Sequence, residues 1–330
     1  MALSKRQIPY LFSTVVLLIG GILFFTFPIR NIFGIFNSGP HLAIPVFATI
    51  YMGVLYLLVL STFFLASFVD PGIYPREPTD EEDDSRHPLY RVITIDGVQV
   101  KMKWCDSCKF YRPPRCSHCS ICDNCVESFD HHCPWVDNCI GKRNYKYFFY
   151  FVSFLTVFIL SGFGWCVLSI VLYAGNNQWT SVIIEFILLA VGMLVFIPVV
   201  GLTGFHCGLV CMGRTTNEHI TGKFRGSHNP FNEGCARNCA KTLCGSKQPR
   251  YMHYHANSYV SSVVGQRSDG APLYEELDVH HHSLQREEKG ASMDRHGRET
   301  HVPIQMTDFG NLDNSTTASS RSLEIAEVTV

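Results

Sequence analysis

Residues 105–139 read CDSCKFYRPPRCSHCSICDNCVESFDHHCPWVDNC and hold eight cysteines and three histidines. Their spacing is C-x2-C-x9-H-C-x2-C-x2-C-x6-H-C-x5-C. Thiolates and imidazoles that recur at such short intervals are the usual ligands of structural zinc. With a ligand every few residues, the stretch has little room for a hydrophobic core. We therefore predict a module whose folding free energy comes largely from bound metal.

Two four-ligand sets account for most of these residues. Each set contains three cysteines and one histidine, which suits tetrahedral zinc. One set is Cys105, Cys108, His118 and Cys125, and the other is Cys119, Cys122, His132 and Cys139. Sequence order alone leaves open which ligands share a metal. A disulfide framework is the competing interpretation, and it requires an oxidising compartment.

Cys116 and Cys133 lie outside both sets. Only Cys133 has a spare imidazole nearby, on His131, which in turn follows the carboxylate of Asp130. A free thiol with a pKa of ~8.5 needs an adjacent base or cation to react at neutral pH. We predict that Cys133 is a nucleophile, His131 its base and Asp130 the group that orients the base. Two alternatives stay open: a purely structural zinc module, and Asp130 as a turn residue or a support for a zinc-bound histidine.

The composition predicts a membrane protein. The chain has 330 residues, of which 47% are hydrophobic and 13% aromatic. Four long apolar runs account for this, at residues 10–27, 42–69, 147–173 and 181 to about 212. Each run is long enough to cross ~30 Å of hydrocarbon as a helix, and buried core helices rarely run so long without charge. The first run lacks a small-residue cleavage site, so we expect it to stay on the protein.

Lysine and arginine predict the orientation of these helices. Residues 70–146 carry eleven of them, residues 28–41 carry Arg30 alone, and residues 174–180 carry none. Because cytosolic loops are rich in positive charge, we expect the Cys-rich loop and both termini in the cytosol. Thiols stay reduced there, which favours metal binding over disulfides.

The fold class expected is an α-helical integral membrane protein with a cytosolic two-zinc domain between the second and third of four transmembrane helices. Its predicted divisions are 1–69 with the first two helices, 70–146 with the Cys-rich core at 103–148, 147–213 with the last two helices, 214–250 as a cytosolic segment, and 251–330 as a tail. The tail is rich in Ser, His, Arg, Glu and Gly and has little periodicity, which predicts disorder. Residues 90–95 and 98–102 alternate around Asp96-Gly97, which predicts a β-hairpin.

The position of Cys133 suggests its substrate. It precedes the third apolar run by about a dozen residues, so the thiol is expected near the bilayer surface. An electrophile with a long apolar tail fits this place, because each buried CH2 contributes ~0.8 kcal/mol. Lys142, Arg143 and Lys146 can bind phosphates of a carrier. They can equally be the positive residues that flank a membrane helix on the cytosolic side.

Residues 105–148 resemble the Cys-rich domain of the DHHC-type protein S-acyltransferases, the palmitoyltransferases. Three further stretches match motifs of that family: Asp70-Pro71-Gly72 its DPG motif, Thr215-Thr216-Asn217-Glu218 its TTxE motif, and residues 229–238 its C-terminal motif, which ends in asparagine. The resemblance covers about residues 10–240. It is specific, because the Asp-His-His-Cys-Pro-Trp run lies in a Cys-rich loop between the second and third of four predicted helices.

The resemblance implies a two-step reaction. Cys133 attacks the thioester of palmitoyl-CoA and then passes the chain to a membrane-proximal cysteine of a cytosolic or membrane protein. It also implies two structural zinc ions, an acyl chain among the four helices and contact of Trp135 with that chain. Thr216 would hydrogen-bond near Asp130, and Asn238 would tie the C-terminal segment to the helices.

Other expectations concern partners and location. The chain ends in Val330 with a free carboxylate, a pattern that PDZ domains bind. Cys235, Cys239 and Cys244 follow the last helix and are either acylated or unmodified thiols. The Golgi, the endoplasmic reticulum and the plasma membrane are the candidate compartments, and we expect no nucleic-acid partner.

Two other functions compete with acyl transfer. One is a membrane-anchored zinc adaptor, for example a ubiquitin-ligase-like scaffold, in which Cys133 has no chemical role. The other is a transporter or channel with a regulatory zinc loop, which ordinarily places ionisable residues inside the membrane. Only Glu185 meets that requirement, and it lies near the lumenal edge.

Overall fold

The computed structural model describes residues 5–36, 39–77, 88–173, 179–226, 228–245 and 276–277. These residues belong to one compact unit, Met1–His280, and residues 281–330 form a second unit outside the described part. Nearly all of the predicted tail, including Val330, therefore lies outside the described residues.

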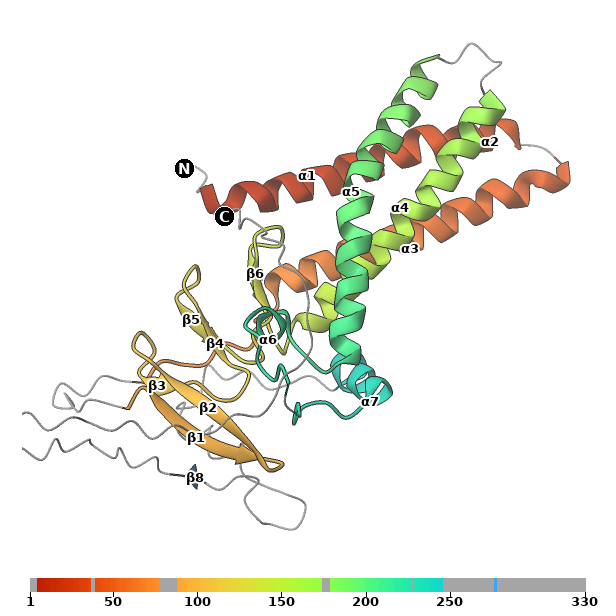
Figure 1. The fold of residues 1–330 in the computed structure, drawn as a ribbon. Coiled ribbons are helices and arrows are strands. Elements are labelled where there is room, and N and C mark those ends of the chain that lie inside the picture. Colours follow the sequence, from red (N-terminus) through yellow and green to blue (C-terminus); the bar gives the residue numbers. More distant parts are fainter. Residues whose placement is uncertain are drawn as a thin grey trace, which may run out of the picture. The chain divides into compact units, whose positions relative to one another are not determined.

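Four helical segments are long and apolar enough to cross a membrane, which confirms the predicted fold class. The first combines α1 (Ile8–Phe24), η2 (Phe25–Ile29) and α2 (Arg30–Ile35), and the others are α3 (Ala43–Phe68), α4 (Tyr145–Tyr173) and α5 (Trp179–Cys211) (Figure 1). Two short 3-10 helices, η1 (Lys5–Gln7) and η3 (Gly39–Leu42), precede the first and second segments. The Cys-rich region lies between the second and third spans, as predicted.

The first span is longer than predicted. The apolar run was expected to end at residue 27, but the helical segment continues through Pro28 to Gly34. Proline has no N–H and crowds the preceding turn, so it normally ends or kinks a helix. Here a π-helical turn, η2, surrounds Pro28 and lets the helix continue.

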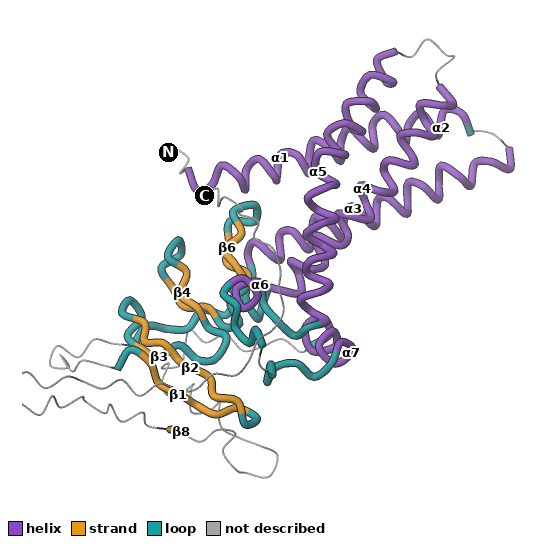
Figure 2. The backbone as a smooth tube through the Cα atoms, in the orientation of Figure 1, coloured by secondary structure: helices purple, strands orange, loops and turns teal. Residues whose placement is uncertain are grey.

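Short antiparallel strands make up the Cys-rich region (Figure 2). They are β1 (Tyr90–Ile95), β2 (Val98–Cys105), β3 (Phe110–Tyr111), β4 (Ser117–Cys119), β5 (Asn124–Val126), β6 (His131–Cys133) and β7 (Asn138–Ile140). The β1–β2 hairpin turns at Asp96 and Gly97, which both have positive φ, as the Asp-Gly pair predicted. β2 extends beyond the predicted end at residue 102 and reaches Cys105. The other edge of β1 pairs with β8 (Glu276–Leu277).

Side-chain amides attach the last of these hairpins to the end of α3. The final carbonyls of a helix have no partner within the helix, so they need donors from elsewhere. Asn138 Nδ2 lies 3.2, 3.0 and 3.0 Å from the carbonyl oxygens of Ala66, Ser67 and Val69. Asn144 Nδ2 donates to the Ala66 carbonyl as well, at 3.1 Å. The β6–β7 hairpin and the start of α4 are therefore fixed to the end of α3.

The predicted DPG motif forms the turn that follows α3. The Asp70 carboxylate accepts hydrogen bonds from the N–H groups of Gly72 and Ile73, and it pairs with Arg143 at 2.9 Å. Gly72 has a φ of +107°, a conformation that side chains rarely adopt. The turn thus directs the chain from the membrane helix toward the Cys-rich strands.

Three short helical elements follow α5: α6 (Thr216–Ile220), α7 (Cys235–Cys239) and η4 (Ala240–Cys244). The main apolar core joins the ends of α3, α4 and α5 to the β6–β7 hairpin. Its buried members are Val59, Phe63, Ala66, Cys133, Val136, Ile140, Tyr145, Phe148, Phe151, Val152, Leu155 and Val210. Cys133 therefore belongs to the core of the helical bundle as well as to the Cys-rich loop.

The first prediction concerns the close packing around Gly141. A Cβ at this position would lie 2.6 Å from the Pro71 carbonyl oxygen and 2.4 Å from Val126 Cγ1. Because the first neighbour is backbone, we expect Gly141→Ala to cost about 1–3 kcal/mol of stability by overpacking. Thermal unfolding of the detergent-solubilised protein measures the loss. Gly164→Ala is the matched control, since nothing lies within 4 Å of a Cβ there; equal midpoints for the two variants would contradict the packing described.

Candidate active site and metal centres

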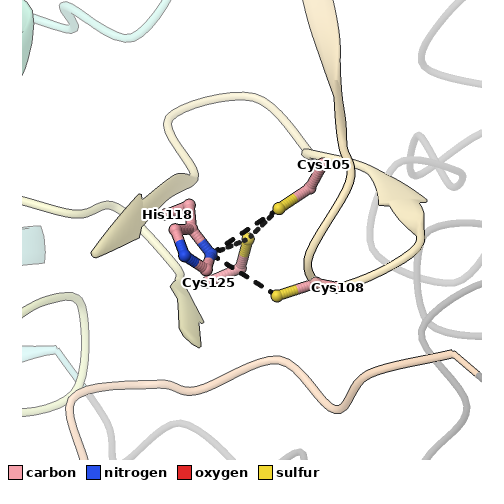
Figure 3. Close-up of side chains that lie close together, drawn as sticks. All are labelled: Cys105, Cys108, His118 and Cys125. Atoms are coloured by element: carbon pink, nitrogen blue, oxygen red, sulfur yellow. Dashed lines mark hydrogen bonds between the residues drawn. The ribbon is translucent and has the colours of Figure 1, made fainter. Parts of the chain in front are cut away.

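The first predicted ligand set converges in the structure. His118 Nδ1 lies 3.6 Å from Cys105 Sγ, 3.5 Å from Cys108 Sγ and 3.8 Å from Cys125 Sγ (Figure 3). A tetrahedral zinc with Zn–S of about 2.3 Å and Zn–N of about 2.0 Å places S and N about 3.5 Å apart. His118 and Cys125 face each other across the β4–β5 pair, so strand register brings two of the four ligands together. The donor set and its spacing fit zinc.

The second set converges in the same way on the β6–β7 hairpin. His132 and Cys139 are cross-strand partners. His132 Nδ1 lies 3.5 Å from Cys122 Sγ and 3.8 Å from Cys139 Sγ, and Cys119 completes a group whose ligand atoms all lie within 4.8 Å of one another. The structure therefore forms the two interleaved groups of four that the spacing suggested, and each can hold a metal ion.

The two groups are copies of one unit, which the sequence analysis did not notice. Every ligand of the second set follows its counterpart in the first by fourteen positions. The strands repeat with the same period, since β6 and β7 correspond to β4 and β5. The left-handed turn residues repeat too, at Lys109, Asp123 and Asp137, with φ of 61°, 51° and 48°. Self-comparison of the sequence would have revealed this period.

The repeat explains why Cys133 is left without a metal. Cys133 follows Cys119 by fourteen positions, so it stands where the first ligand of a third group would be. The remaining three positions of such a group fall on Val136, Lys146 and Ser153, which cannot complete a zinc site. Cys133 accordingly lies in neither group.

Strand geometry separates Cys133 from the metal ligand beside it. Successive side chains of a strand point to opposite faces, so His131 and Cys133 share one face of β6 and His132 lies on the other. The His132 face holds the second metal group. The opposite face packs on the helices, where Cys133 is 6% exposed among apolar side chains. The tripeptide His131–Cys133 thus supplies one ligand to the second metal group and a thiol that belongs to neither group.

Asp130 and His131 form a close pair beside this thiol. His131 Nδ1 lies 2.7 Å from Asp130 Oδ2, and Asp130 is 1% exposed. Burial disfavours the charged ring, but hydrogen bonds to Asp130 and Cys133 outweigh it and raise the pKa of His131 to about 9. Burial likewise opposes the charged carboxylate, yet the hydrogen bonds from His131 and Thr216 lower the pKa of Asp130. The structure therefore brings together the three residues predicted to act as nucleophile, base and orienting group.

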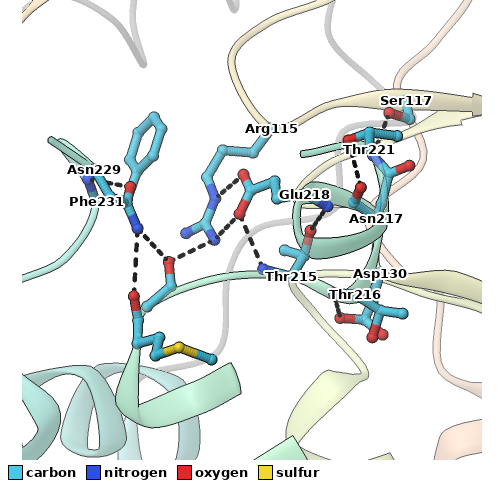
Figure 4. Close-up of polar contacts among 12 residues, drawn as sticks. Arg115, Ser117, Asp130, Thr215, Thr216, Asn217, Glu218, Thr221, Asn229 and Phe231 are labelled. Atoms are coloured by element: carbon cyan, nitrogen blue, oxygen red, sulfur yellow. Dashed lines mark hydrogen bonds and ion pairs between the residues drawn. The ribbon is translucent and has the colours of Figure 1, made fainter. Parts of the chain in front are cut away.

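The predicted TTxE motif holds Asp130 through the main chain. The Thr216 N–H donates to Asp130 Oδ1 at 2.8 Å (Figure 4). The Thr216 hydroxyl, in contrast, is buried and has no hydrogen-bond partner among the described residues. The expected link between Thr216 and Asp130 exists, but any residue with an N–H at this position can make it.

The rest of the motif anchors α6 to the Cys-rich region. Thr215 caps α6 in a capping box with Glu218, in which each side chain bonds the other residue's N–H. Both Glu218 oxygens accept from Arg115, with N–O distances of 2.8 Å (Figure 4). Arg115 also donates to the Gly213 carbonyl and lies over the Phe231 ring. The sequence analysis missed Arg115, although the Thr-x-x-Glu spacing of a capping box was visible.

Asn238 joins the C-terminal segment to the last span, as the family resemblance implied. Its Nδ2 donates to the Cys211 carbonyl at 2.9 Å and to Asn232 Oδ1 at 2.7 Å. Its Oδ1 accepts from the Glu233 N–H. Asn238 therefore caps the end of α5 and orders the loop before α7.

A basic cavity of about 440 Å³ opens where α4, α5 and the segment after α5 meet. Its lining includes six cationic residues, namely Arg115, Lys142, Arg143, Lys146, Arg214 and Lys241. Lys142 pairs with Glu127, and Arg143 pairs with Asp70, so both have structural partners. Lys146 and Arg214 pair with no carboxylate among the described residues and donate to the carbonyls of Gly245 and Phe224. These two cations are the ones most available to an anionic ligand.

Trp135 lies in the turn between β6 and β7 and is 53% exposed. Its ring lies 6.4 Å from the Phe12 ring, and its carbonyl accepts from Ser13 Oγ at 2.7 Å. The side chain therefore stands beside α1 near the Cys133 strand.

The cysteines after α5 have different surroundings. Cys235 forms a disulfide with Cys211, which differs from the reduced thiol expected for a cytosolic segment. Cys239 is half-buried against the main core, and Cys244 is exposed.

The structure combines four apolar spans, a repeated Cys/His metal unit, and a thiol, an imidazole and a carboxylate beside that unit. These features define a polytopic membrane protein with a thiol-centred site. Residues 98–223 match the family model described as DHHC palmitoyltransferase. This part of the chain is therefore similar to the DHHC palmitoyltransferases, as the sequence motifs indicated.

Curated relatives of this chain are palmitoyltransferases. Palmitoyltransferase ZDHHC5-A of Danio rerio is 54% identical over 216 residues, which are 65% of this chain and 29% of that protein. Palmitoyltransferase ZDHHC5 of Homo sapiens is 55% identical over 205 residues, 62% of this chain and 29% of that protein. The matched part thus spans less than a third of the length of these relatives.

The second prediction separates main-chain from side-chain roles in the TTxE motif. We expect Thr216→Val to keep the wild-type thermal unfolding midpoint or raise it, because it removes a buried hydroxyl without a partner. Glu218→Gln should lower stability by about 3 kcal/mol, because it breaks a buried ion pair with Arg115. Calorimetry in detergent measures both. A marked loss in Thr216→Val would show that the hydroxyl has a partner.

Proposed function

We propose that this protein is a protein S-palmitoyltransferase that transfers a long acyl chain from acyl-CoA to cysteines of proteins through a thioester on Cys133. The observation that carries the proposal is the grouping of Cys133, His131 and Asp130, in which the thiol lies outside both metal groups and inside the apolar core. The family match and the palmitoyltransferase relatives support it. They do not favour a structural zinc adaptor. Glu185 is the only carboxylate among the described residues of the four spans, which gives the transporter alternative little support.

In the first step, His131 takes the proton of the Cys133 thiol, and the sulfur attacks the carbonyl carbon of the acyl-CoA thioester. A bond from Cys133 to the acyl carbon forms as the bond to the CoA sulfur breaks, and His131 gives the departing CoA thiolate a proton. His131 suits this role because it retains a proton near neutral pH beside Asp130 and Cys133. Asp130 fixes the ring orientation through Nδ1.

In the second step, the thiol of the protein substrate replaces Cys133 on the acyl carbon. His131 takes the proton of the incoming thiol, and the Cys133 thiolate leaves. One thioester is exchanged for another in each step, so the reaction needs no ATP. The thiols that can react are those of cytosolic or membrane proteins with cysteines close to the bilayer, because Cys133 lies at the base of the membrane helices.

Two zinc ions complete the module in this proposal, one in each group of four ligands. Bound zinc would supply the folding free energy that the short hairpins lack, since thiolates and imidazoles replace an apolar core. Cys105, Cys108, His118 and Cys125 would hold one ion, and Cys119, Cys122, His132 and Cys139 the other. Their role is structural, because each group already has four protein ligands.

The substrate has a polar and an apolar end, and the surroundings of Cys133 match both. Phe63, Phe148 and Phe151 line the core next to the thiol, which suits an acyl chain between the helices. We assign the CoA phosphates to the basic cavity. Lys146 and Arg214 would meet them directly, whereas Lys142 and Arg143 would shape the cavity through their ion pairs. Trp135 would contact the chain near the thioester.

The proposal also includes a location. Both termini and the Cys-rich loop face the cytosol, in a membrane of the Golgi, the endoplasmic reticulum or the cell surface.

The third prediction tests the acyl-enzyme. We expect purified protein incubated with palmitoyl-CoA to gain the mass of one palmitoyl group, removable by hydroxylamine, as a thioester is. Cys133→Ser should not gain it. Cys116→Ser, which alters the other cysteine of residues 105–139 outside the two four-ligand groups, should gain it as wild type does. Intact-mass analysis reads all three. Equal labelling of Cys133→Ser and wild type would end the proposal.

The fourth prediction distinguishes residues that bind metal from the residue that acts as the base. His132→Ala and Cys139→Ser remove proposed ligands, so we expect them to lose about half of the bound zinc and to unfold at lower temperature. His131→Ala should keep all its zinc but acylate Cys133 about 10²–10⁴ times more slowly, the contribution of a general base. Elemental analysis and single-turnover mass spectrometry measure the two effects. Similar zinc loss in all three variants would overturn the role assignment.

A further inference from the structure

A second buried histidine lies next to the proposed reaction centre and has no role in the steps above. His206 lies near the end of α5 and is 1% exposed. Its Nδ1 is 2.9 Å from the hydroxyl of Tyr145, the first residue of α4. If the phenol donates, the neutral imidazole keeps its proton on Nε2. The Tyr145 bond therefore fixes the orientation of the His206 ring.

His206 belongs to the wall that surrounds His131. The two imidazole rings are 6.1 Å apart, and the Phe148 ring meets both edge-on, at 5.2 Å from His131 and 5.1 Å from His206. The nearest polar atoms of Asp130, His131 and His206 all lie within 4.8 Å of one another. The His131 ring is thus held by Asp130 through a hydrogen bond and by Phe148 and His206 through contact.

A purely structural explanation accounts poorly for this arrangement. Burying an imidazole and a phenol at the end of a membrane helix costs free energy that one mutual hydrogen bond only partly offsets. An apolar pair of the same size would join α4 and α5 without that cost. Polar side chains kept inside membrane bundles commonly serve a functional site, and the site next to this pair is the one around Cys133.

We propose that His206, held by Tyr145, is a positioning residue that keeps the His131 ring in the orientation facing both Asp130 and Cys133. The inference rests on the proposed acyl transfer and adds a residue to it. A catalytic base needs close alignment with the proton it moves, and small misplacement of reacting groups costs about 10²-fold in rate. His206 would exert this control without touching the acyl chain or the transferred proton.

The test uses full-length protein and four variants. His206→Phe keeps the ring bulk but loses both nitrogens, Tyr145→Phe loses only the hydroxyl, His206→Gln keeps a polar partner for Tyr145, and Cys207→Ala changes the exposed neighbour as a control. We expect about a 10- to 100-fold lower kcat in His206→Phe and a smaller loss in Tyr145→Phe, with the KM for palmitoyl-CoA within about twofold. His206→Gln should recover part of the rate, and Cys207→Ala should match wild type.

A second measurement distinguishes this inference from the proposed function. The rate of Cys133 alkylation by iodoacetamide, followed by peptide mass spectrometry, depends on His131 but not on acyl-CoA. Slower alkylation in His206→Phe and Tyr145→Phe supports the positioning role even if wild type never forms an acyl-enzyme, a result that would refute the proposed function alone. Wild-type kcat and alkylation in a zinc-replete Tyr145→Phe and His206→Phe would overturn the inference. If His206→Phe loses zinc, the kcat and the alkylation rate of Tyr145→Phe alone decide whether the inference holds.

Discussion

The hydrogen bonds from two asparagine amides to the last carbonyls of α3 determine where the Cys-rich region meets the membrane helices. Asn138 and Asn144 satisfy carbonyls that a helix end otherwise leaves to water, and both flank the second metal group. Because Asn138 is the cross-strand partner of Cys133, the same bonds hold the thiol against the helical core. A loop whose own buried clusters are small and consist largely of cysteines thereby acquires a fixed position relative to the bundle.

Because side chains alternate along a strand, three consecutive residues face two different surroundings. His132 faces the metal group, whereas His131 and Cys133 face the helices. A helix in this place would have spread the three side chains by about 100° each, and no such clean division would result. The main-chain bond from Thr216 and the ion pair of Glu218 with Arg115 close the site from the side of α6. The segment after the last span thus helps to hold Asp130 although it is distant in sequence.

Much of this could be predicted from the sequence. The four spans, the hairpin at Asp96-Gly97 and the two ligand sets depend on local composition and spacing, which are visible in the chain. The roles of Arg115 and His206 were not predictable, because their partners Glu218 and Tyr145 are far away in sequence and neither residue stands in a recognisable pattern. The first span was predicted too short because its continuation through Pro28 depends on a π-helical turn that has no simple sequence signal.

The fourteen-residue period also explains the position of the Cys133 thiol. At its downstream edge, the repeated unit that forms the ligand groups presents a thiol on a hairpin, in the position of a first ligand. Nothing downstream among the described residues completes a coordination sphere, so this sulfur keeps its lone pairs. The Cys133 sulfur is, in that sense, a ligand position that neither metal group uses.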